Sequence, residues 1–275
     1  MSRLCRILGV SRGGYYAWLN REPSKRHKEN QAALGHIREV YLEFRKAYGS
    51  PRVHEELKKR GFGWGRNRVA RLMKWAGIRA LRQYYYKRHT LALTGHGRFE
   101  TQNLVNQNFE VKKPNHIWAS DITQFRTGSG WLYLAVVMDL FSRRIIGWSM
   151  KTTLREELAI DALDMAIQTR EDKTPLIHHS DQGSQYSSRG FLAKLGEHRI
   201  KSSMNQRGSC YDNAVVESFF KTLKAELVRT VRFDRVEDAR SKLFEFIEVF
   251  YNRKRLHSSL GYKSPVEFEG RATLN

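Results

Sequence analysis

Residues 176–186 read Leu-Ile-His-His-Ser-Asp-Gln-Gly-Ser-Gln-Tyr, and residues 210–227 read Cys-Tyr-Asp-Asn-Ala-Val-Val-Glu-Ser-Phe-Phe-Lys-Thr-Leu-Lys-Ala-Glu-Leu. In the first stretch a short apolar run predicts a strand, and Asp181 follows where a loop of Ser, Gly and Gln begins. The second stretch has the spacing of a helix. These two stretches bring an acid at a strand end and an acid on a helix into one region of the chain.

The helix of the second stretch carries one charged face. Asp212 or Asn213 can cap its start, and Glu217, Lys221 and Lys224 follow at i, i+4 and i+7. One acid in line with two cations indicates a site that holds metal ions beside a phosphate backbone.

A third acid, Asp121, stands inside a predicted strand, 117–125, between apolar neighbours. An isolated acid in an apolar strand is costly unless it is paired or binds a cation. Carboxylates suit Mg²⁺ or Mn²⁺, and two such ions about 3.5–4 Å apart can stabilise the attacking and leaving oxygens of an in-line displacement. Any one acid alone is better explained as an exposed or capping carboxylate. Together, Asp121, Asp181 and Glu217 predict a catalytic metal site.

The composition is that of a folded protein with a nucleic-acid partner. The chain has 275 residues, 40% of them hydrophobic, and a net charge of +21. Residues 1–100 carry 23 basic and 7 acidic side chains, whereas residues 101–275 carry 26 and 21. Such a basic first third favours a polyanion, because each neutralised phosphate releases condensed counterions. A merely solvated surface and a membrane surface are the weaker alternatives.

The sequence shows no targeting or redox signal. No apolar run approaches the ~18 residues needed to span a bilayer, and the N-terminus lacks the apolar core of a signal peptide. Two cysteines, Cys5 and Cys210, give neither a disulfide framework nor a zinc site. We therefore expect a cytoplasmic protein, at the nucleoid when it is bound to DNA, with no membrane partner.

Helical spacing dominates the first 89 residues. Residues 1–30 are interpreted as a partial helix-turn-helix and a charged linker, with Met1 almost inside the motif. Residues 31–89 are predicted to form a helix-turn-helix DNA-binding domain, with a helix capped by Ser50 before Pro51 and ended by Gly61.

A basic helix at 66–75 is the predicted recognition helix of that domain. Its outward cations, expected to contact DNA in the major groove, are Arg66, Arg68, Arg71 and Lys74. A small bundle with a charged exterior is the alternative for this segment. Residues 90–108 are predicted to be a linker.

Strand patterns begin at residue 109. Strands are expected at 117–125, 131–140, 143–150, 176–180 and near Ile200, with a hairpin at 128–130. Helices are expected at 154–168, 187–197, around Glu217 and at 236–251. This order is typical of a ribonuclease-H-like α/β fold with a mixed five-stranded sheet. The predicted core spans 109–270 and is followed by a tail, 271–275.

The spacing of the acids resembles a known signature. Thirty-five residues separate Asp181 from Glu217, and Lys224 follows Glu217 by seven. The chain resembles the D,D(35)E transposases and retroviral integrases, and most closely the second-reading-frame transposase of the insertion sequence 3 family. The resemblance covers nearly the whole chain and includes Tyr-Gly-Ser-Pro-Arg-Val at 48–53, His-Ser-Asp-Gln-Gly-Ser-Gln-Tyr at 179–186 and the tail motif at 251–265. Unlike retroviral integrases, residues 1–100 show no His₂Cys₂ zinc arrangement.

The resemblance implies a function. Asp121, Asp181 and Glu217 would be the metal-binding catalytic triad, with two Mg²⁺ or Mn²⁺ ions, and Lys224 would contact DNA beside it. The protein would bind the terminal inverted repeats of its element, nick the ends by metal-dependent hydrolysis and join the 3′-OH to target DNA by transesterification. Expected partners are DNA, further copies of the chain on DNA, and an upstream-frame protein or fusion.

Other polar residues near the acids are assigned lesser roles. Asp139 is interpreted as structural, paired with Arg143 or Arg144, and Cys210 is not expected to be a nucleophile. His178 and His179 are expected to be packed or to contact DNA. Substrate contacts are expected from a further group of side chains, Lys221, Gln182, Gln185 and Tyr186.

Two other functions stay open from the sequence. A non-catalytic DNA-binding regulator would use residues 1–90 and have an inactive core. A general ribonuclease-H-like nuclease fits less well, because two segments resembling helix-turn-helix motifs imply site recognition.

Overall fold

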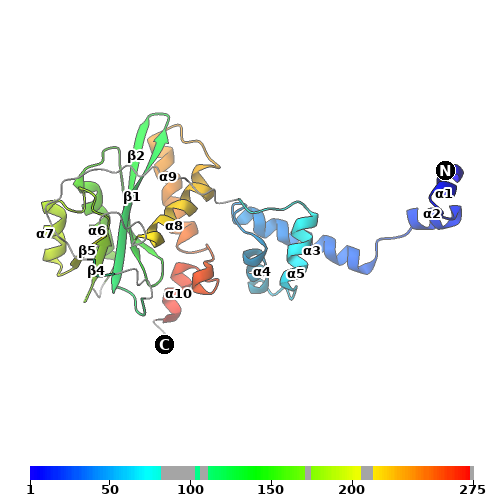
Figure 1. Cartoon of the computed structure of the whole chain (residues 1–275), viewed down its shortest axis with the longest axis horizontal. Coiled ribbons are helices and arrows are strands. Elements are labelled where there is room, and N and C mark those ends of the chain that lie inside the picture. The colour runs from blue at the N-terminus through cyan, green and yellow to red at the C-terminus, as the bar shows by residue number, and fades with distance from the viewer. Residues whose placement is uncertain (82–102, 106–110, 171–174, 206–212, 273–275) are drawn as a thin grey trace. The chain divides into compact units, whose positions relative to one another are not determined.

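The structure is a computed structural model that describes residues 1–81, 103–105, 111–170, 175–205 and 213–272. It divides into two compact units, Met1–Ala80 and Leu81–Asn275 (Figure 1). Most of the predicted linker (90–108), the end of the predicted tail, Asp212 and Cys210 lie outside the described residues. In the described part, no helix is long and apolar enough to cross a membrane.

The first unit is helical, as the sequence pattern predicts. Its helices are α1 (Ser2–Ile7), α2 (Arg12–Leu19), α3 (Lys25–Glu43), α4 (Ser50–Lys59) and α5 (Arg66–Trp75). The last three pack on one another through fully buried apolar side chains, among them Ile37, Val40, Val53, Leu57 and Val69.

Local signals explain where these helices begin and end. Ser11 and Ser24 cap α2 and α3, since their hydroxyls accept the backbone N–H of the residue three positions on. The prediction that Ser50 caps α4 is wrong by one residue: Gly49 is the N-cap, and Ser50 and Pro51 are already helical. Gly61, with φ of +87°, takes the left-handed conformation directly after α4.

The second unit is built on one five-stranded mixed sheet of order β3-β2-β1-β4-β5 (Figure 1). The strands are β1 (Ile117–Thr127), β2 (Gly130–Asp139), β3 (Ile145–Lys151), β4 (Ile177–Ser180) and β5 (Lys201–Met204). The first three are antiparallel, and β4 and β5 run parallel to β1. The predicted ribonuclease-H-like layout and the hairpin between β1 and β2 are confirmed.

Helices cover both faces of this sheet. On one face α6 (Glu156–Thr169) and α7 (Arg189–Glu197) bury Trp118, Ala135 and Val137 in a large apolar cluster. The other face meets α8 (Ala214–Leu223), which contacts β1, and α9 (Val236–Phe244), which contacts β2. The side chains of β1 alternate between the faces, so Trp118 lies towards α6 and α7, and Asp121 lies towards α8.

Two helices of the second unit widen into π-helical turns. Residues Lys224–Val228 continue α8 as η1, and residues Glu245–Tyr251 continue α9 as η2. A short 3-10 turn, η3 (Ser258–Leu260), and α10 (Pro265–Ala272) complete the unit. The sequence pattern predicts one uninterrupted helix over 236–251, and the π turn in its second half is a correction.

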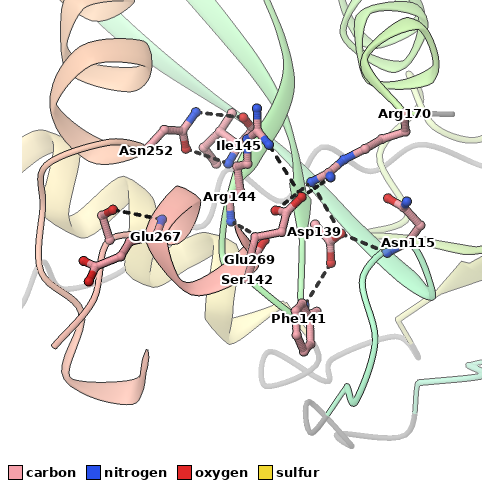
Figure 2. A network of polar contacts seen from close by, with 11 residues as sticks. Asn115, Asp139, Phe141, Ser142, Arg144, Ile145, Arg170, Asn252, Glu267 and Glu269 are labelled. Atoms are coloured by element: carbon pink, nitrogen blue, oxygen red, sulfur yellow. Dashed lines mark hydrogen bonds and ion pairs between the residues drawn. The ribbon is translucent and has the colours of Figure 1, made fainter. Parts of the chain in front are cut away.

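A buried polar network ties the end of β2 to α10 (Figure 2). The Asp139 carboxylate accepts the backbone N–H groups of Asn115 and Phe141, each at 2.9 Å, and lies 3.6 Å from the Arg170 guanidinium. Arg170 also makes a two-pronged ion pair with Glu269. Asp139 therefore has a structural role, as predicted, but the ion pair expected with Arg143 or Arg144 is replaced by one with Arg170.

Candidate active site

Asp121 lies in the central strand β1, on the face that meets α8. The only hydrogen bond described for its carboxylate comes from the Ile122 backbone N–H, at 2.8 Å. The side chain is partly accessible, yet protein surrounds it on the other sides. Burial raises the pKa of Asp121 to about 8, with further upward contributions from the charges of Asp181 and Glu217.

Asp181 reaches the same place from the neighbouring strand. β1 and β4 are parallel with Ala119 beside His179, and Asp121 and Asp181 each follow that pair by two residues, Asp121 inside β1 and Asp181 directly after β4. The Gly183 N–H donates to the Asp181 carboxylate at 3.0 Å. A Cβ at Gly183 would lie 2.9 Å from the same oxygen, so a larger residue there would push the Asp181 carboxylate aside.

The Asp181 carboxyl is more accessible to solvent than that of Asp121. Burial raises its pKa, and the Gly183 hydrogen bond partly offsets that rise. Water on the open side of Asp181 screens its charge and limits the effect of burial. The charge of Asp181 also disfavours ionisation of Asp121. Ionising both carboxyl groups is therefore unfavourable unless a cation is bound between them.

The helix α8 supplies the third carboxylate and a cation. Glu217 is half-buried in the first turn of α8 and lies 3.5 Å from the Lys221 ammonium. Lys224 lies where α8 widens into η1, and its charge interacts with that of Asp121. Burial lowers the pKa of Lys224, and Asp121 works against that change. Asp121 thus interacts with all three of Asp181, Glu217 and Lys224.

The three side chains offer carboxylate oxygens, the ligand type that a hard divalent cation prefers. The three carboxylates nevertheless stand apart from one another. Buried carboxylates with raised pKa values that repel one another are stabilised when a cation lies between them. In the described part of the chain, no three His, Cys, Asp or Glu side chains are grouped closely enough to hold a metal ion as they stand.

The two histidines before Asp181 are packed inside the protein. His178 bonds the Ser120 hydroxyl at 2.7 Å, and burial lowers its pKa to about 3. His179 bonds the Ser203 hydroxyl at 2.9 Å and the Asn205 side chain at 2.5 Å. The packed alternative predicted for both is confirmed.

The predicted substrate contacts around Asp181 differ in exposure. Tyr186 and Gln185 are buried, whereas Gln182 is exposed and donates to the Asn205 carbonyl at 2.9 Å. Burial raises the pKa of the Tyr186 phenol, and the charges of Asp121 and Asp181 add to that rise. A direct DNA contact is therefore open to Gln182 but not to Tyr186 as it stands.

Two asparagines near the acids have roles that the sequence does not predict. Asn213 occupies the N-cap position of α8, as expected, but its side chain does not cap the helix and instead donates to the Ser120 carbonyl at 3.0 Å. Asn205 bonds His179 and the Asp181 loop. No signal in the sequence reveals these bonds, because they depend on where β1, β4 and β5 come together.

The basic helix α5 presents most of its predicted DNA contacts to solvent. Arg66, Arg71 and Lys74 are exposed. Arg68 is not outward as predicted: its guanidinium bonds Asn30 at 3.0 Å and lies 3.7 Å from Glu29, so it joins α5 to α3.

Comparison with known protein families divides the chain in the same way. An Integrase core domain family matches residues 111–210, and a second family of that description matches residues 198–265. An HTH-like domain family matches residues 28–87.

Two relatives are similar over nearly their whole length. Transposase InsF for insertion sequence IS3A of Escherichia coli (strain K12) is 40% identical over 270 residues, which cover 98% of this chain and 93% of the relative. The insertion element IS600 uncharacterized 31 kDa protein of Shigella sonnei is 38% identical, with coverage of 96% and 97%.

Among solved structures, a simian T-cell lymphotropic virus intasome in complex with PP2A regulatory subunit B56 gamma is similar in fold. The TM-score is 0.50 at 16% identity, over 85% of this chain and 74% of that chain. At this identity the similarity supports the fold.

Proposed function

We propose, since this chain belongs to the insertion sequence 3 family of transposases, that it cuts the ends of its own element and joins them to new DNA with Asp121, Asp181 and Glu217. The chain is a transposase with an integrase catalytic core, a polynucleotidyl transferase. The observation that supports the proposal is that Asp121 lies in β1, Asp181 directly follows the adjacent strand β4, and Glu217 lies in α8, which contacts β1.

The three carboxylates would hold Mg²⁺ or Mn²⁺, with two ions in the active complex. Bound there, the ions would stabilise the charge on the attacking and leaving oxygens of an in-line displacement at phosphorus. Asp121, in β1, and Asp181, in the loop directly after the parallel strand β4, would set the position of the scissile phosphate. Glu217 comes from the other side, on α8, and completes the set by releasing Lys221.

Lys224 would hold the DNA backbone beside these acids. It lies two turns from Glu217, so it can neutralise a phosphate without displacing a carboxylate from the cation. Its burial weakens its hydration, which strengthens its interaction with a phosphate oxygen. Lys221 would join it once Glu217 turns to the cation.

The reaction follows in two displacements. In the first, a water oxygen attacks phosphorus at the element end, the P–O3′ bond breaks, and the leaving oxygen takes a proton to become a 3′-OH. In the second, that hydroxyl attacks a phosphodiester of the target, and another 3′ oxygen leaves. Each step exchanges one P–O bond for another, so no energy source and no covalent protein intermediate are required.

Binding to the element ends is assigned to the helical unit. Its excess of positive charge suits DNA, and α5 follows α4 in helix-turn-helix order with Arg66, Arg71 and Lys74 exposed. The proposed partners are therefore the element ends, target DNA and further copies of the chain bound to paired ends.

Asp181→Asn provides the test. The substitution keeps the size of the side chain and removes its charge, so we expect end cleavage and strand transfer to fall at least a thousandfold. The substrate is a duplex that carries the terminal repeats flanking the coding sequence, with Mg²⁺. Binding to that duplex in EDTA should not change.

The variant Ser184→Ala, at an exposed loop position three residues on, is the matched control and should remain active. Undiminished cleavage by Asp181→Asn would exclude the proposed triad. Binding to the ends without cation-dependent cleavage by the wild-type chain would favour a DNA-binding regulator.

A further inference from the structure

Two asparagine side chains anchor the second half of the connection between Asp181 and Glu217. Asn205 follows β5, and Asn213 is the N-cap of α8. Residues 206–212, which join them, lie outside the described residues. The contacts of these two asparagines lead to the strands that carry the two aspartates.

Asn205 forms hydrogen bonds with residues on both sides of Asp181. Its backbone N–H donates to the Ser180 carbonyl at 3.1 Å, and its own carbonyl accepts the Gln182 side-chain amide at 2.9 Å. Its side-chain Oδ1 lies 2.5 Å from the His179 Nε2. Three bonds from one residue thus fix positions 179, 180 and 182 around the carboxylate.

The bond to His179 has a defined direction. With the Asn205 Oδ1 as acceptor, the His179 Nε2 carries the proton, and Nδ1 accepts the Ser203 hydroxyl at 2.9 Å. His179 is fully buried. Asn205 therefore acts through its side-chain oxygen.

Asn213 makes the complementary contact at β1. Its side-chain Nδ2 donates to the Ser120 carbonyl at 3.0 Å, and the asparagine is 5% exposed. The last pair of the β1–β4 ladder is Ala119 with His179. Ser120 lies just beyond it and just before Asp121, so Asn213 continues the bonding of β1 where β4 ends. Asn213 acts through its side-chain nitrogen.

We propose that Asn205 and Asn213 are positioning residues that hold the Asp181 loop and the start of α8 at fixed places relative to Asp121. The inference rests on the proposed function and extends it. Two carboxylates that repel each other tend to separate, and anchors that carry no charge can restrain them without neutralising them. Removing either anchor should loosen the cation site without affecting the helical unit.

The test measures cation affinity without DNA or catalysis. MnCl₂ is titrated calorimetrically into the full chain and into Asn205→Ala and Asn213→Ala. Loss of a residue that orients the ligands of a metal lowers affinity by about 10–100-fold, and we expect a Mn²⁺ dissociation constant about tenfold higher for each variant. Ser202→Ala, in β5 on the opposite face from Ser203, is the matched control and should match the wild type.

Substitution by aspartate separates the two roles. Asn205→Asp keeps the acceptor for His179, so its Mn²⁺ affinity should return to that of the wild type or exceed it. Asn213→Asp removes the donor to Ser120, so its affinity should stay below that of Asn205→Asp. Equal Mn²⁺ affinities for the two variants would overturn the inference, because only Asn213→Asp loses its hydrogen bond.

Unchanged Mn²⁺ affinity in both alanine variants would also overturn it. If Asn205→Ala melts at a much lower temperature, Gln182→Ala takes its place, since it removes one of the three bonds from an exposed side chain. A wild-type affinity for Gln182→Ala would then count against the Asn205 anchor. If the wild-type chain does not cleave element ends but the variants still show the expected loss of Mn²⁺ affinity, the proposed function is contradicted. The positioning role of the two asparagines would then remain supported.

Discussion

At the scale of single residues, Asp121 places a carboxylate in a central strand, where a divalent cation could bind it. One backbone hydrogen bond is described for its carboxylate, and burial and the charges of Asp181 and Glu217 raise its pKa. In the protein without a cation, the three carboxylates repel one another. A bound cation removes this repulsion, and the free energy released favours binding. The same repulsion lowers the folding stability of the cation-free protein and raises its affinity for the cation.

The first prediction concerns the pH dependence of stability in EDTA. The pKa of Asp121 rises to about 8 in the folded state from an ordinary value of 3.8. Between these values the native state keeps a proton that the unfolded chain has lost, so stability falls as pH rises through this window. Asp121→Asn lacks this titration. We expect its melting temperature to exceed that of the wild type by a few °C at pH 8, which corresponds to about 1 kcal/mol.

At pH 4 the two melting temperatures should converge, and MgCl₂ at pH 8 should raise only that of the wild type. Thermal denaturation followed by circular dichroism is the measurement. Parallel pH profiles for wild type and variant would mean that Asp121 carries no electrostatic cost in the fold.

The second prediction separates two neighbouring lysines. Lys224 is half-buried beside Asp121, whereas the Lys221 side chain is 50% exposed and paired with Glu217. A cation in a dry site interacts with phosphate more strongly than an exposed one. Lys224→Ala should therefore reduce strand transfer about a hundredfold, within the range seen when one preorganised donor is removed, and Lys221→Ala less than tenfold.

Single-turnover strand-transfer rates at saturating DNA measure this difference. Equal losses for both lysines would mean that burial of Lys224 has no catalytic consequence.

Spacing in the sequence and the family resemblance single out the three acids and Lys224, and their role as a joint cation and phosphate site stays a prediction. Spacing is not enough for Arg68, which has the same pattern as its exposed neighbours but bonds Asn30 in α3. The roles of Asn205 and Asn213 also escape the sequence. Their partners are distant along the chain and become neighbours only when the sheet forms.

At the scale of elements, α5 contains cations with two different roles. Arg71 and Lys74 are exposed, while Arg68 joins two helices. Arg71→Ala or Lys74→Ala should weaken DNA binding and lower the slope of log affinity against log salt by about one for each lost phosphate contact. Melting should not change.

Arg68→Ala, in contrast, should lower the stability of the helical unit by about 1 kcal/mol, because hydrogen bonds to a charged group are lost. Fluorescence anisotropy across a salt series and thermal melts distinguish the two classes. A salt slope for Arg68→Ala that falls as much as that for Arg71→Ala would contradict the assignment.

A fourth prediction concerns the contact between β3 and α6. A Cβ at Gly147 would lie 2.1 Å from the Ala162 carbonyl oxygen and 2.7 Å from the Ala166 nitrogen. Both are backbone atoms, so the helix itself must move. Gly147→Ala should cost about 3 kcal/mol or more, at the upper end for overpacking, whereas Gly196→Ala, with open space around it, should cost less than about 1 kcal/mol. Urea denaturation measures both; similar midpoints would contradict the close approach.

The strands and helices of the core follow the predicted order. The spacing of apolar residues distinguishes strands, with a period of two, from helices, and it marks the face of each that packs in the core. Their ends are less well predicted. The π turns η1 and η2 continue α8 and α9, and no residue pattern in the sequence predicts them. Their effect on the site is direct, since Lys224 is the first residue of η1.

At the scale of the whole molecule, charge and chemistry fall on different parts of the chain. The first 100 residues hold 23 basic against 7 acidic side chains, while the carboxylates of the site all lie beyond residue 120. The excess of positive charge in the first third suits it to bind the DNA backbone.

The central claim is that Asp121, Asp181 and Glu217 hold the cation that cuts DNA, and an Asp181→Cys chain tests it most directly. A thiolate binds Mn²⁺ in preference to Mg²⁺, which favours oxygen. End cleavage should be lost in Mg²⁺ and return in Mn²⁺, while Ser184→Cys cleaves with either ion. Cleavage by Asp181→Cys at the wild-type rate in Mg²⁺, or no recovery in Mn²⁺, would contradict the claim.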